Sequence, residues 1–224
     1  MQEVRLHHEL EVFEDLEALS TAAAHYVARR AREAADTSGA FHFAVSGGRS
    51  PWQMFAVLTT LDVPWDRTLI WQVDERVAPG DDPDRNLAHL RQALGDKAAQ
   101  VRPMPVEDHD LEEAAARYAG GLPDRFDVVH LGIGPDGHTA SLVPGDPVLD
   151  VDDRLVALTT SAYEGRRRMT LTYPGLRRAG QLLWLVSGED KRDPLAKLLE
   201  GDRSIPAARV EAGASLVMAD RSAT

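Results

Sequence analysis

Residues 126–145, FDVVHLGIGPDGHTASLVPG, join an apolar, β-rich run to a loop that carries glycines, an acid and a histidine. The run predicts a strand. Six other stretches have the same character, and several of them are apolar on both faces, as strands inside a parallel sheet are. These stretches are residues 41–46, 68–74, 154–160, 168–173, 181–188 and 215–220.

Helical patterns fill the stretches between these strands. One helix face is marked by the spacing of Leu16, Leu19, Ala23, Tyr26, Val27 and Arg30. Three further helices are predicted at residues 86–94, 111–118 and 195–199. Alternating strands and helices predict a doubly wound α/β fold, with a mostly parallel sheet flanked by helices. Because we find no repeat and no linker, we expect residues 1–224 to form a single domain.

The composition excludes several classes of protein. The 224 residues include no cysteine, which rules out a disulfide scaffold, a thiolate metal site and a cysteine nucleophile. A net charge of −11 argues against a general nucleic-acid binder. Residues 1–13 lack the pattern of a signal peptide, and no apolar run approaches the roughly 20 residues of a membrane helix. We therefore expect a cytoplasmic monomer or homodimer with no membrane or nucleic-acid partner.

Ligands bind outside the carboxyl ends of the strands in open α/β sheets, so a ligand site is expected in the loops that follow strands. Residues 46–51, SGGRSP, follow one predicted strand. Gly47 and Gly48 permit a tight turn. Ser50 can cap a helix, and Pro51 suits its first turn. The segment fits either a phosphate site at a helix N-terminus or a plain strand-to-helix turn.

Charged residues gather beside the ends of other strands. Asp74, Glu75 and Arg76 form either part of a ligand site or a solvated charge cluster. Arginines and lysines also occur in residues 164–172, EGRRRMTLT, and 185–199, LVSGEDKRDPLAKLL. Arginine and lysine in such places can bind phosphate. Most of these cations are expected to be ordinary surface charge.

The glycine-rich loop holds the strongest candidate for catalysis. A histidine has an unperturbed pKa of about 6.5, so His138 can act as a base near neutral pH. Asp136 can orient the imidazole, and loop N–H groups can meet a developing oxyanion. One alternative is a structural histidine in a tight loop. The other is a dinucleotide site, from the G-x-G-x-x-G spacing of Gly132, Gly134 and Gly137, but the motif lies in mid-chain beside an acid.

Together these segments resemble the 6-phosphogluconolactonase family, within the superfamily that includes glucosamine-6-phosphate deaminase. SGGRSP is similar to the family's SGG-x-T-P phosphate loop, and VDERVAPGDDPDRN to its DER-x-V-P…D-x-N segment. GIGPDGHTASLVPG is the most specific match, to G-x-G-x-DGHTASLFPG. RMTLT, SGEDK and IPAARV match three further segments in the same order. The resemblance runs over most of the chain, from about residue 40 to residue 210.

The resemblance implies a lactone hydrolase that uses neither a cofactor nor a metal. Its substrate would be the δ-lactone of 6-phosphogluconate, in the oxidative pentose phosphate pathway. His138 would be the general base that activates water, with Asp136 as its neighbour and Arg76 beside the substrate. The implied phosphate-binding residues, with the last two acting as side-chain cations, are Ser46, Gly47, Gly48, Ser50, Arg168 and Lys191. No compact trio of metal ligands is evident in the sequence.

Several positions depart from the family pattern. Ser50 replaces a threonine and keeps the hydroxyl. Arg85 stands where many members have serine, which would add a cation near the crevice. Arg168 is chosen over Arg166 and Arg167 by its spacing to MTLT, because the prolines often found before this arginine are missing.

Two other functions are compatible with these residues. A sugar-phosphate deaminase or isomerase would share the phosphate loop, but its pattern carries a glutamate five residues after the histidine. Val143 stands there and cannot ionise, which favours the lactonase. A non-catalytic sugar-phosphate binding module would need neither Asp136 nor His138, so their presence favours an enzyme.

Overall fold

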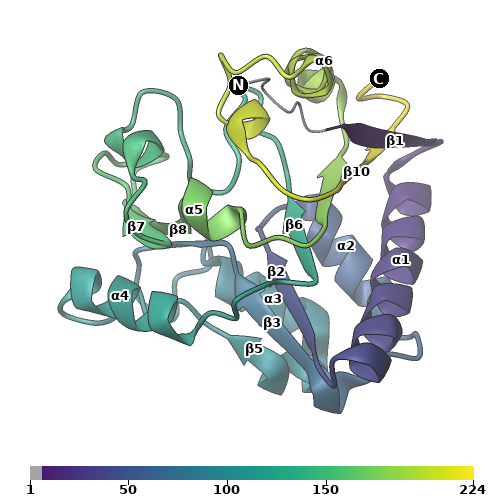
Figure 1. The fold of residues 1–224 in the computed structure, drawn as a ribbon, viewed down its shortest axis with the longest axis horizontal. Helices are drawn as coiled ribbons and strands as arrows, with labels where there is room; N and C mark the ends of the chain where they lie inside the picture. Colours follow the sequence, from purple (N-terminus) through teal and green to yellow (C-terminus); the bar gives the residue numbers. More distant parts are fainter. Residues whose placement is uncertain (1–6) are drawn as a thin grey trace.

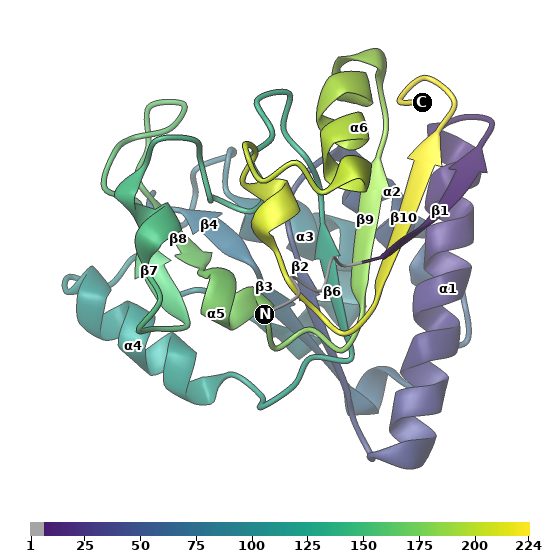
Figure 2. The ribbon, with the colours of Figure 1, turned by 45° about the horizontal axis from the view of Figure 1, so that its top comes forward.

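The computed structural model describes residues 7–224, and Figure 1 shows central strands with helices packed around them. Among these residues, seven strands form one parallel sheet in the order β1-β10-β9-β6-β2-β3-β5. Figure 2 shows β6, β9, β10 and β1 side by side. The strands of this sheet are β1 (His8–Phe13), β2 (Phe41–Val45), β3 (Thr68–Gln72), β5 (Val101–Arg102), β6 (Val128–Leu131), β9 (Leu182–Val186) and β10 (Ser215–Asp220).

A smaller antiparallel sheet stands beside the large one. Its three strands, in order, are β4 (Asp74–Arg76), β8 (Arg168–Leu171) and β7 (Val156–Leu158). The chain passes between the sheets at Val73, which donates to Val45 O at 2.9 Å and accepts from Leu171 N at 2.8 Å. Residues 154–160 and 168–173 therefore contain strands, as predicted, but these strands lie outside the parallel sheet.

The predicted helices begin within three residues of the expected positions, and α1 is longer than expected. α1 continues to Thr37, well beyond Arg30, the last residue of the spacing that predicted it. Asp15 caps its N-terminus by accepting a hydrogen bond from Ala18 N. The α-helices are α1 (Leu16–Thr37), α2 (Arg49–Leu58), α3 (Asn86–Leu94), α4 (Leu111–Gly121), α5 (Tyr173–Leu176) and α6 (Arg192–Glu200). Short 3₁₀ turns lie at Trp65–Arg67, Gly95–Gln100, Pro147–Asp150, Glu189–Lys191 and Ala207–Arg209.

The two edge strands of the large sheet escaped prediction. β5 has only two residues, which is too short to leave a pattern. β1 lies at the other edge of the sheet and alternates acidic and apolar residues, of which Leu10 and Val12 remain exposed. Neither strand carries a residue expected at the site.

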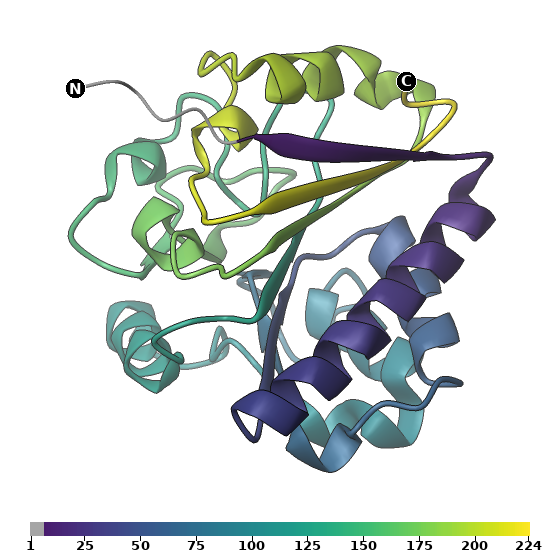
Figure 3. The same ribbon diagram turned by 45° about the vertical axis from the view of Figure 1, so that its right-hand side comes forward.

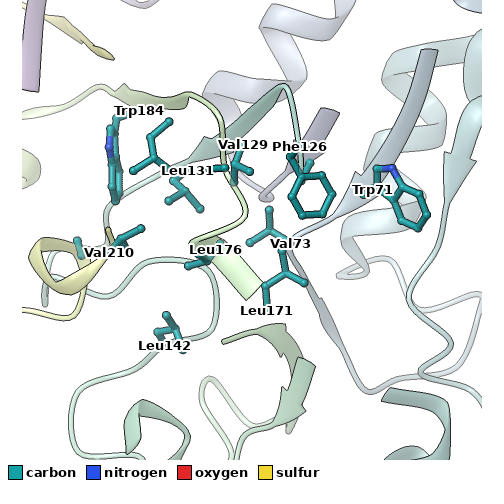
Figure 4. Close-up of a cluster of buried hydrophobic side chains, with 14 of the residues drawn as sticks. Trp71, Val73, Phe126, Val129, Leu131, Leu142, Leu171, Leu176, Trp184 and Val210 are labelled. Carbon is teal, nitrogen blue, oxygen red and sulfur yellow. The ribbon is translucent and has the colours of Figure 1, made fainter. Parts of the chain in front are cut away.

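Separate hydrophobic clusters cover the two faces of the large sheet. Helices α1, α2 and α3 pack on one face, while α4, α5, α6 and the small sheet cover the other. Figure 3 shows purple α1 on one side of the sheet and yellow-green α6 on the opposite side. In Figure 4, Leu131 and Trp184 of the large sheet share a cluster with Leu171 of the small sheet and Leu142 of the loop after β6. This shared core fixes the loop after β6 relative to both sheets.

The predicted fold class, a mostly parallel sheet flanked by helices, is confirmed. The predicted single domain covers residues 1–224, and residues 1–6 of that range lie outside the described residues. Within residues 7–224, no helix combines the length and the apolar character needed to cross a membrane.

Candidate active site

The carboxyl ends of β2, β6 and β9 border a cavity of about 620 Å³. All the residues expected at the site except Asp136 line this cavity, namely Ser46, Gly47, Gly48, Ser50, Arg76, His138, Arg168 and Lys191. Asp136 contacts one of them, His138. Segments that are distant in the sequence therefore meet where an open α/β sheet is expected to bind its ligand.

The segment after β2 turns sharply into α2. Gly48 takes the N-cap position with a φ of 133°, a conformation that L side chains rarely adopt. The helix begins at Arg49, so Ser50 lies inside the first turn, and the expectation that Ser50 caps the helix is wrong. A Cβ on Gly47 would lie 2.2 Å from Asn86 Oδ1. The two glycines thus let the unpaired N–H groups of the first turn border the cavity, an arrangement that suits an anion.

Asp136 and His138 are in direct contact in the loop after β6. His138 Nδ1 lies 2.5 Å from Asp136 Oδ1, which also accepts the backbone N–H of His138 at 3.1 Å. Partial burial raises the pKa of Asp136, but the hydrogen bonds from His138 outweigh it, and the net pKa lies below the ordinary value. The ionised carboxylate therefore holds the imidazole in one orientation and fixes which nitrogen carries the proton.

Tyr163 is a further neighbour of His138 that the sequence did not reveal. The two rings meet edge to face with centroids 5.1 Å apart, and the Tyr163 hydroxyl lies 3.4 Å from His138 Nδ1. Burial, followed by the charge of Asp136, raises the pKa of Tyr163. Its hydroxyl therefore stays protonated near neutral pH. The only local signal was Gly165 two residues later, because glycine is common in turns.

Two glycines shape the loop around His138. A Cβ on Gly134 would lie 2.0 Å from His138 Nδ1 and 2.1 Å from its Cε1. Gly137 has a φ of 81°, and a Cβ there would lie 2.5 Å from Ile205. The next helical element along the chain is the short 3₁₀ turn Pro147–Asp150. The G-x-G-x-x-G spacing is therefore not followed directly by the helix that a dinucleotide site needs, and it frames the histidine instead.

Arg76 and Arg168 lie directly opposite each other in the pairing of β4 with β8. Arg168 is almost fully buried, its Nη2 lies 2.7 Å from Glu164 Oε2, and its guanidinium lies 5.3 Å from the centre of the Tyr163 ring. Arg76 donates to Asn86 Oδ1 at 2.9 Å and lies 3.7 Å from Glu164 Oε2. The small sheet thus brings two guanidinium groups to one wall of the cavity.

The neighbouring arginines have other partners. Arg166 pairs with Asp82, and Arg167 donates to Thr159 O at 3.1 Å. Neither of them lines the cavity. Of these three neighbouring arginines, Arg168 is the one that lines the cavity, and its role in binding phosphate stays a prediction.

Lys191 enters the cavity from the turn after β9. Its Nζ lies 2.8 Å from Asp190 Oδ2. The turn begins at Gly188, with a φ of 111°, and is tied to the end of β10 by the Gly188 N–H, which donates to Asp220 at 3.3 Å. Lys191 and Arg168 therefore line one cavity while bonding to different acids.

The acids before Arg76 have structural surroundings and do not form a solvated cluster. Asp74 is buried, lines the cavity and accepts from Ser141 Oγ at 2.7 Å. Burial raises its pKa in spite of that hydrogen bond. Glu75 is fully buried and accepts the first two N–H groups of α3 at 2.9 and 2.8 Å. Glu75 therefore anchors a helix and is not a ligand group.

Arg85 does not add a cation to the cavity. Its side chain is buried, its Nε lies 3.4 Å from Glu75 Oε2, and its Nη1 pairs with Glu107. It is absent from the cavity lining within the described chain. The expectation of a cation near the crevice is wrong, because the buried charge of Glu75 turns Arg85 away from it.

Polar side chains without partners are concentrated at the cavity. Three of its lining residues, Ser46, Arg168 and His130, carry buried nitrogen or oxygen atoms with no hydrogen-bond partner among residues 7–224. Nearly all buried polar groups in proteins are paired, so this concentration marks a place for a polar ligand. His130 lies on β6, was not singled out from the sequence, and has its pKa lowered to about 3 by burial. The described part of the chain contains no group of three or more His, Asp or Glu side chains that could hold a metal ion.

Comparisons with known proteins agree with this arrangement. Residues 14–218 match the family model described as glucosamine-6-phosphate isomerases/6-phosphogluconolactonase. A 6-phosphogluconolactonase of Mesorhizobium japonicum is 38% identical over 192 residues, covering 80% of this chain and 80% of that protein. The human GDH/6PGL endoplasmic bifunctional protein is 40% identical over 171 residues, covering 69% of this chain but only 22% of that much longer protein.

Solved structures share the fold. The crystal structure of a putative 6-phosphogluconolactonase from Neisseria gonorrhoeae is 27% identical, with a TM-score of 0.84 over 96% of this chain and 100% of that chain. The range matched by the family model includes the phosphate loop, the histidine loop and the small sheet. This chain therefore belongs to the glucosamine-6-phosphate isomerase/6-phosphogluconolactonase family.

Proposed function

We propose that this chain hydrolyses 6-phospho-D-glucono-1,5-lactone to 6-phospho-D-gluconate, in the oxidative branch of the pentose phosphate pathway. Its relatives carry the name of this activity. The observation that carries the proposal is the 2.5 Å contact between Asp136 and His138, at a cavity that also contains the anion-suited start of α2. The Asp136–His138 pair activates water, and the start of α2 holds a phosphate.

His138 acts as the general base. Because Nδ1 donates its proton to Asp136, the lone pair is on Nε2. Nε2 takes a proton from water as the water oxygen attacks the lactone carbonyl carbon. The imidazolium, stabilised by Asp136, then returns the proton to the ring oxygen as the carbon–oxygen bond of the ring breaks. A lactone is already electrophilic, so the reaction needs no covalent nucleophile.

The phosphate binds where the chain supplies unpaired donors and positive charge. Ser46, Gly47, Gly48 and Ser50 line the cavity at the start of α2, and Ser46 Oγ has no partner in the described residues. Arg168 and Lys191 add charge to the same phosphate, and Arg76 lies beside the substrate. With a net charge of −11, the protein depends on this local positive field to attract an anion. Contacts far from the carbonyl orient it for attack.

Backbone N–H groups of the loop after β6 stabilise the oxyanion that forms during attack. The Tyr163 hydroxyl, which burial and Asp136 keep protonated by raising its pKa, is a further donor beside His138. No step calls for a metal or an organic cofactor.

The deaminase is the nearest rival within the family, whose description includes glucosamine-6-phosphate isomerases. Val143 stands five residues after the histidine, does not line the cavity and supplies no carboxylate. This is the reason for proposing the lactonase.

The deciding experiment is hydrolysis of freshly made lactone by the wild type and by His138→Ala. We expect His138→Ala to lose at least about 10²-fold in kcat, because a positioned base contributes about that much. His109→Ala is the control, since His109 is exposed and does not line the cavity. A wild type no faster than spontaneous hydrolysis would contradict the proposal. Ammonia release from glucosamine 6-phosphate would support the deaminase instead.

We also propose that residues 1–224 form one domain, working in the cytoplasm as a monomer or homodimer without a nucleic-acid partner. The core shared by the two sheets supports one domain, and the acidic charge opposes binding to nucleic acid. Light scattering after size exclusion tests the oligomeric state. Cell fractionation tests the location, and a single cooperative unfolding transition is expected for one domain.

A further inference from the structure

Glu164 lies between the two arginines of the small sheet. Arg76 and Arg168 are direct cross-strand partners, and like charges placed opposite each other on a sheet repel. One carboxylate oxygen, Glu164 Oε2, lies 2.7 Å from Arg168 Nη2 and 3.7 Å from Arg76 Nη2. Glu164 therefore neutralises part of the charge that the arginines bring to the cavity.

The backbone at this position favours a different residue. Glu164 (φ 51°) and Gly165 (φ 78°) form a two-residue turn, which Tyr163 and Arg166 close with backbone hydrogen bonds of 2.9 and 3.3 Å. Turns that need a positive φ at both central residues prefer asparagine, aspartate or glycine. A glutamate here is strained. Turn formation does not account for glutamate, whereas the reach of its carboxylate to the arginines does.

The surrounding contacts let Glu164 leave while the arginines stay. The Glu164 side chain is 62% exposed, whereas that of Arg168 is 6% exposed. Arg76 is also held by Asn86, and Arg168 lies over the Tyr163 ring. An incoming anion can therefore displace the carboxylate without rebuilding the site.

We propose that Glu164 is an internal counter-anion that makes the cavity selective for doubly charged oxyanions. The inference rests on the proposed function in one respect, that the anion is the phosphate of the substrate. A carboxylate ligand gains little over the resident carboxylate, which its own chain holds at high effective concentration. A phosphate dianion carries more charge and three acceptor oxygens, so it wins the exchange.

The test compares the binding of inorganic phosphate and acetate to the wild type and to Glu164→Gln, by calorimetry and thermal shift at fixed ionic strength. We expect Glu164→Gln to bind phosphate about tenfold more tightly, because the competing charge is gone. It should also bind acetate at concentrations where the wild type does not. Glu33→Gln is the matched control, since Glu33 also lies near two arginines, at 3.8 and 3.1 Å, but on α1 outside the cavity lining. It should leave both affinities unchanged.

Two further variants separate charge from other effects. Glu164→Asn suits the turn, so it should fold well and tighten phosphate binding as the glutamine does. In an Arg168→Ala background, Glu164→Gln should lose most of its effect on phosphate affinity. Phosphate binding that is weaker or unchanged in Glu164→Gln would overturn the proposal. Because the readout is binding, absence of lactonase activity would refute the proposed function and leave this result standing.

Discussion

The loop after β6 and the small antiparallel sheet supply the cavity with different groups, and they are built in different ways. The loop joins Asp136 to His138 through contacts within a few residues, including Gly134 N to His138 O at 2.8 Å. The sheet joins Arg76 to Arg168 through the register of β4 against β8. A slip of one residue in that register would turn an arginine to the other face of the sheet.

This difference suggests a division of labour. The loop holds Asp136 and His138 together through its own hydrogen bonds, whereas the small sheet places two guanidinium groups at one wall of the cavity. Under the proposed function, changes in the loop should lower kcat, and changes in the sheet should raise KM. The following variants test that division.

Gly134→Ala should have the largest effect. The new Cβ would lie 2.0 Å from His138 Nδ1 and must push the imidazole away from its position beside Asp136. Displacement of a reacting group by about 1 Å can cost about 10²-fold in rate, so we expect at least that loss in kcat for the lactone. KM should change much less.

Gly132→Ala is the matched control in the same loop. A Cβ on Gly132 has no atom within 4 Å, so the loss of kcat should be far smaller than for Gly134→Ala. Equal losses in the two variants would show that the loss of activity does not come from contact between the new Cβ and His138.

Arg168→Ala and Lys191→Ala should have the next largest effect, on substrate binding. Each removes a charged donor that we assign to the phosphate, which is worth roughly tenfold or more in affinity. We expect KM to rise by about that factor, with a smaller change in kcat. Steady-state kinetics with the lactone provide the measurement.

Arg167→Ala is the control for both variants, because Arg167 lies next to Arg168 in the chain but does not line the cavity. Its KM should equal that of the wild type. An unchanged KM in both Arg168→Ala and Lys191→Ala would remove these residues from the phosphate site.

The contrast between the loop after β6 and the small sheet also explains how much of the site the sequence could predict. The histidine loop could be recognised because its chemistry lies in consecutive residues, and the phosphate loop because glycines before a helix have a known geometry. Arg168 was found only through a resemblance between RMTLT and a family segment. Its direct pairing with Arg76 depends on a register between strands far apart in the chain, which no local pattern encodes.

The residues that the sequence misplaced and those that it failed to reveal share one cause. Their positions depend on contacts between distant parts of the chain. Arg85 was placed near the crevice because the sequence could not show that Glu75 is buried and attracts it. Tyr163 and Glu164 lie in the turn between β7 and β8. The sequence did not indicate that these two strands belong to a separate sheet. His130 was concealed inside an apolar run, where its burial and lack of partners become visible only when β6 is placed in the sheet.

His130→Leu should have the smallest effect on the chemistry but a measurable one on stability, and it tests the strand that leads into the loop with Asp136 and His138. Both ring nitrogens of His130 are buried without a partner among residues 7–224, so leucine should raise the free energy of unfolding by about 1–3 kcal/mol at pH 7. Burial lowers the pKa of His130 to about 3, while the unfolded chain titrates near 6.5. Between these values the unfolded state binds more protons, so the wild type loses stability as the pH falls.

The advantage of His130→Leu should therefore grow below pH 6.5, by up to about 1.4 kcal/mol for each pH unit. Urea unfolding at pH 7 and pH 5 measures it, with the exposed His109→Leu as the control that should show no gain. A constant difference between the two pH values would mean that His130 is not held neutral by burial. A gain in stability joined to weaker phosphate binding would show that the strand gives up stability to keep a polar group facing the substrate.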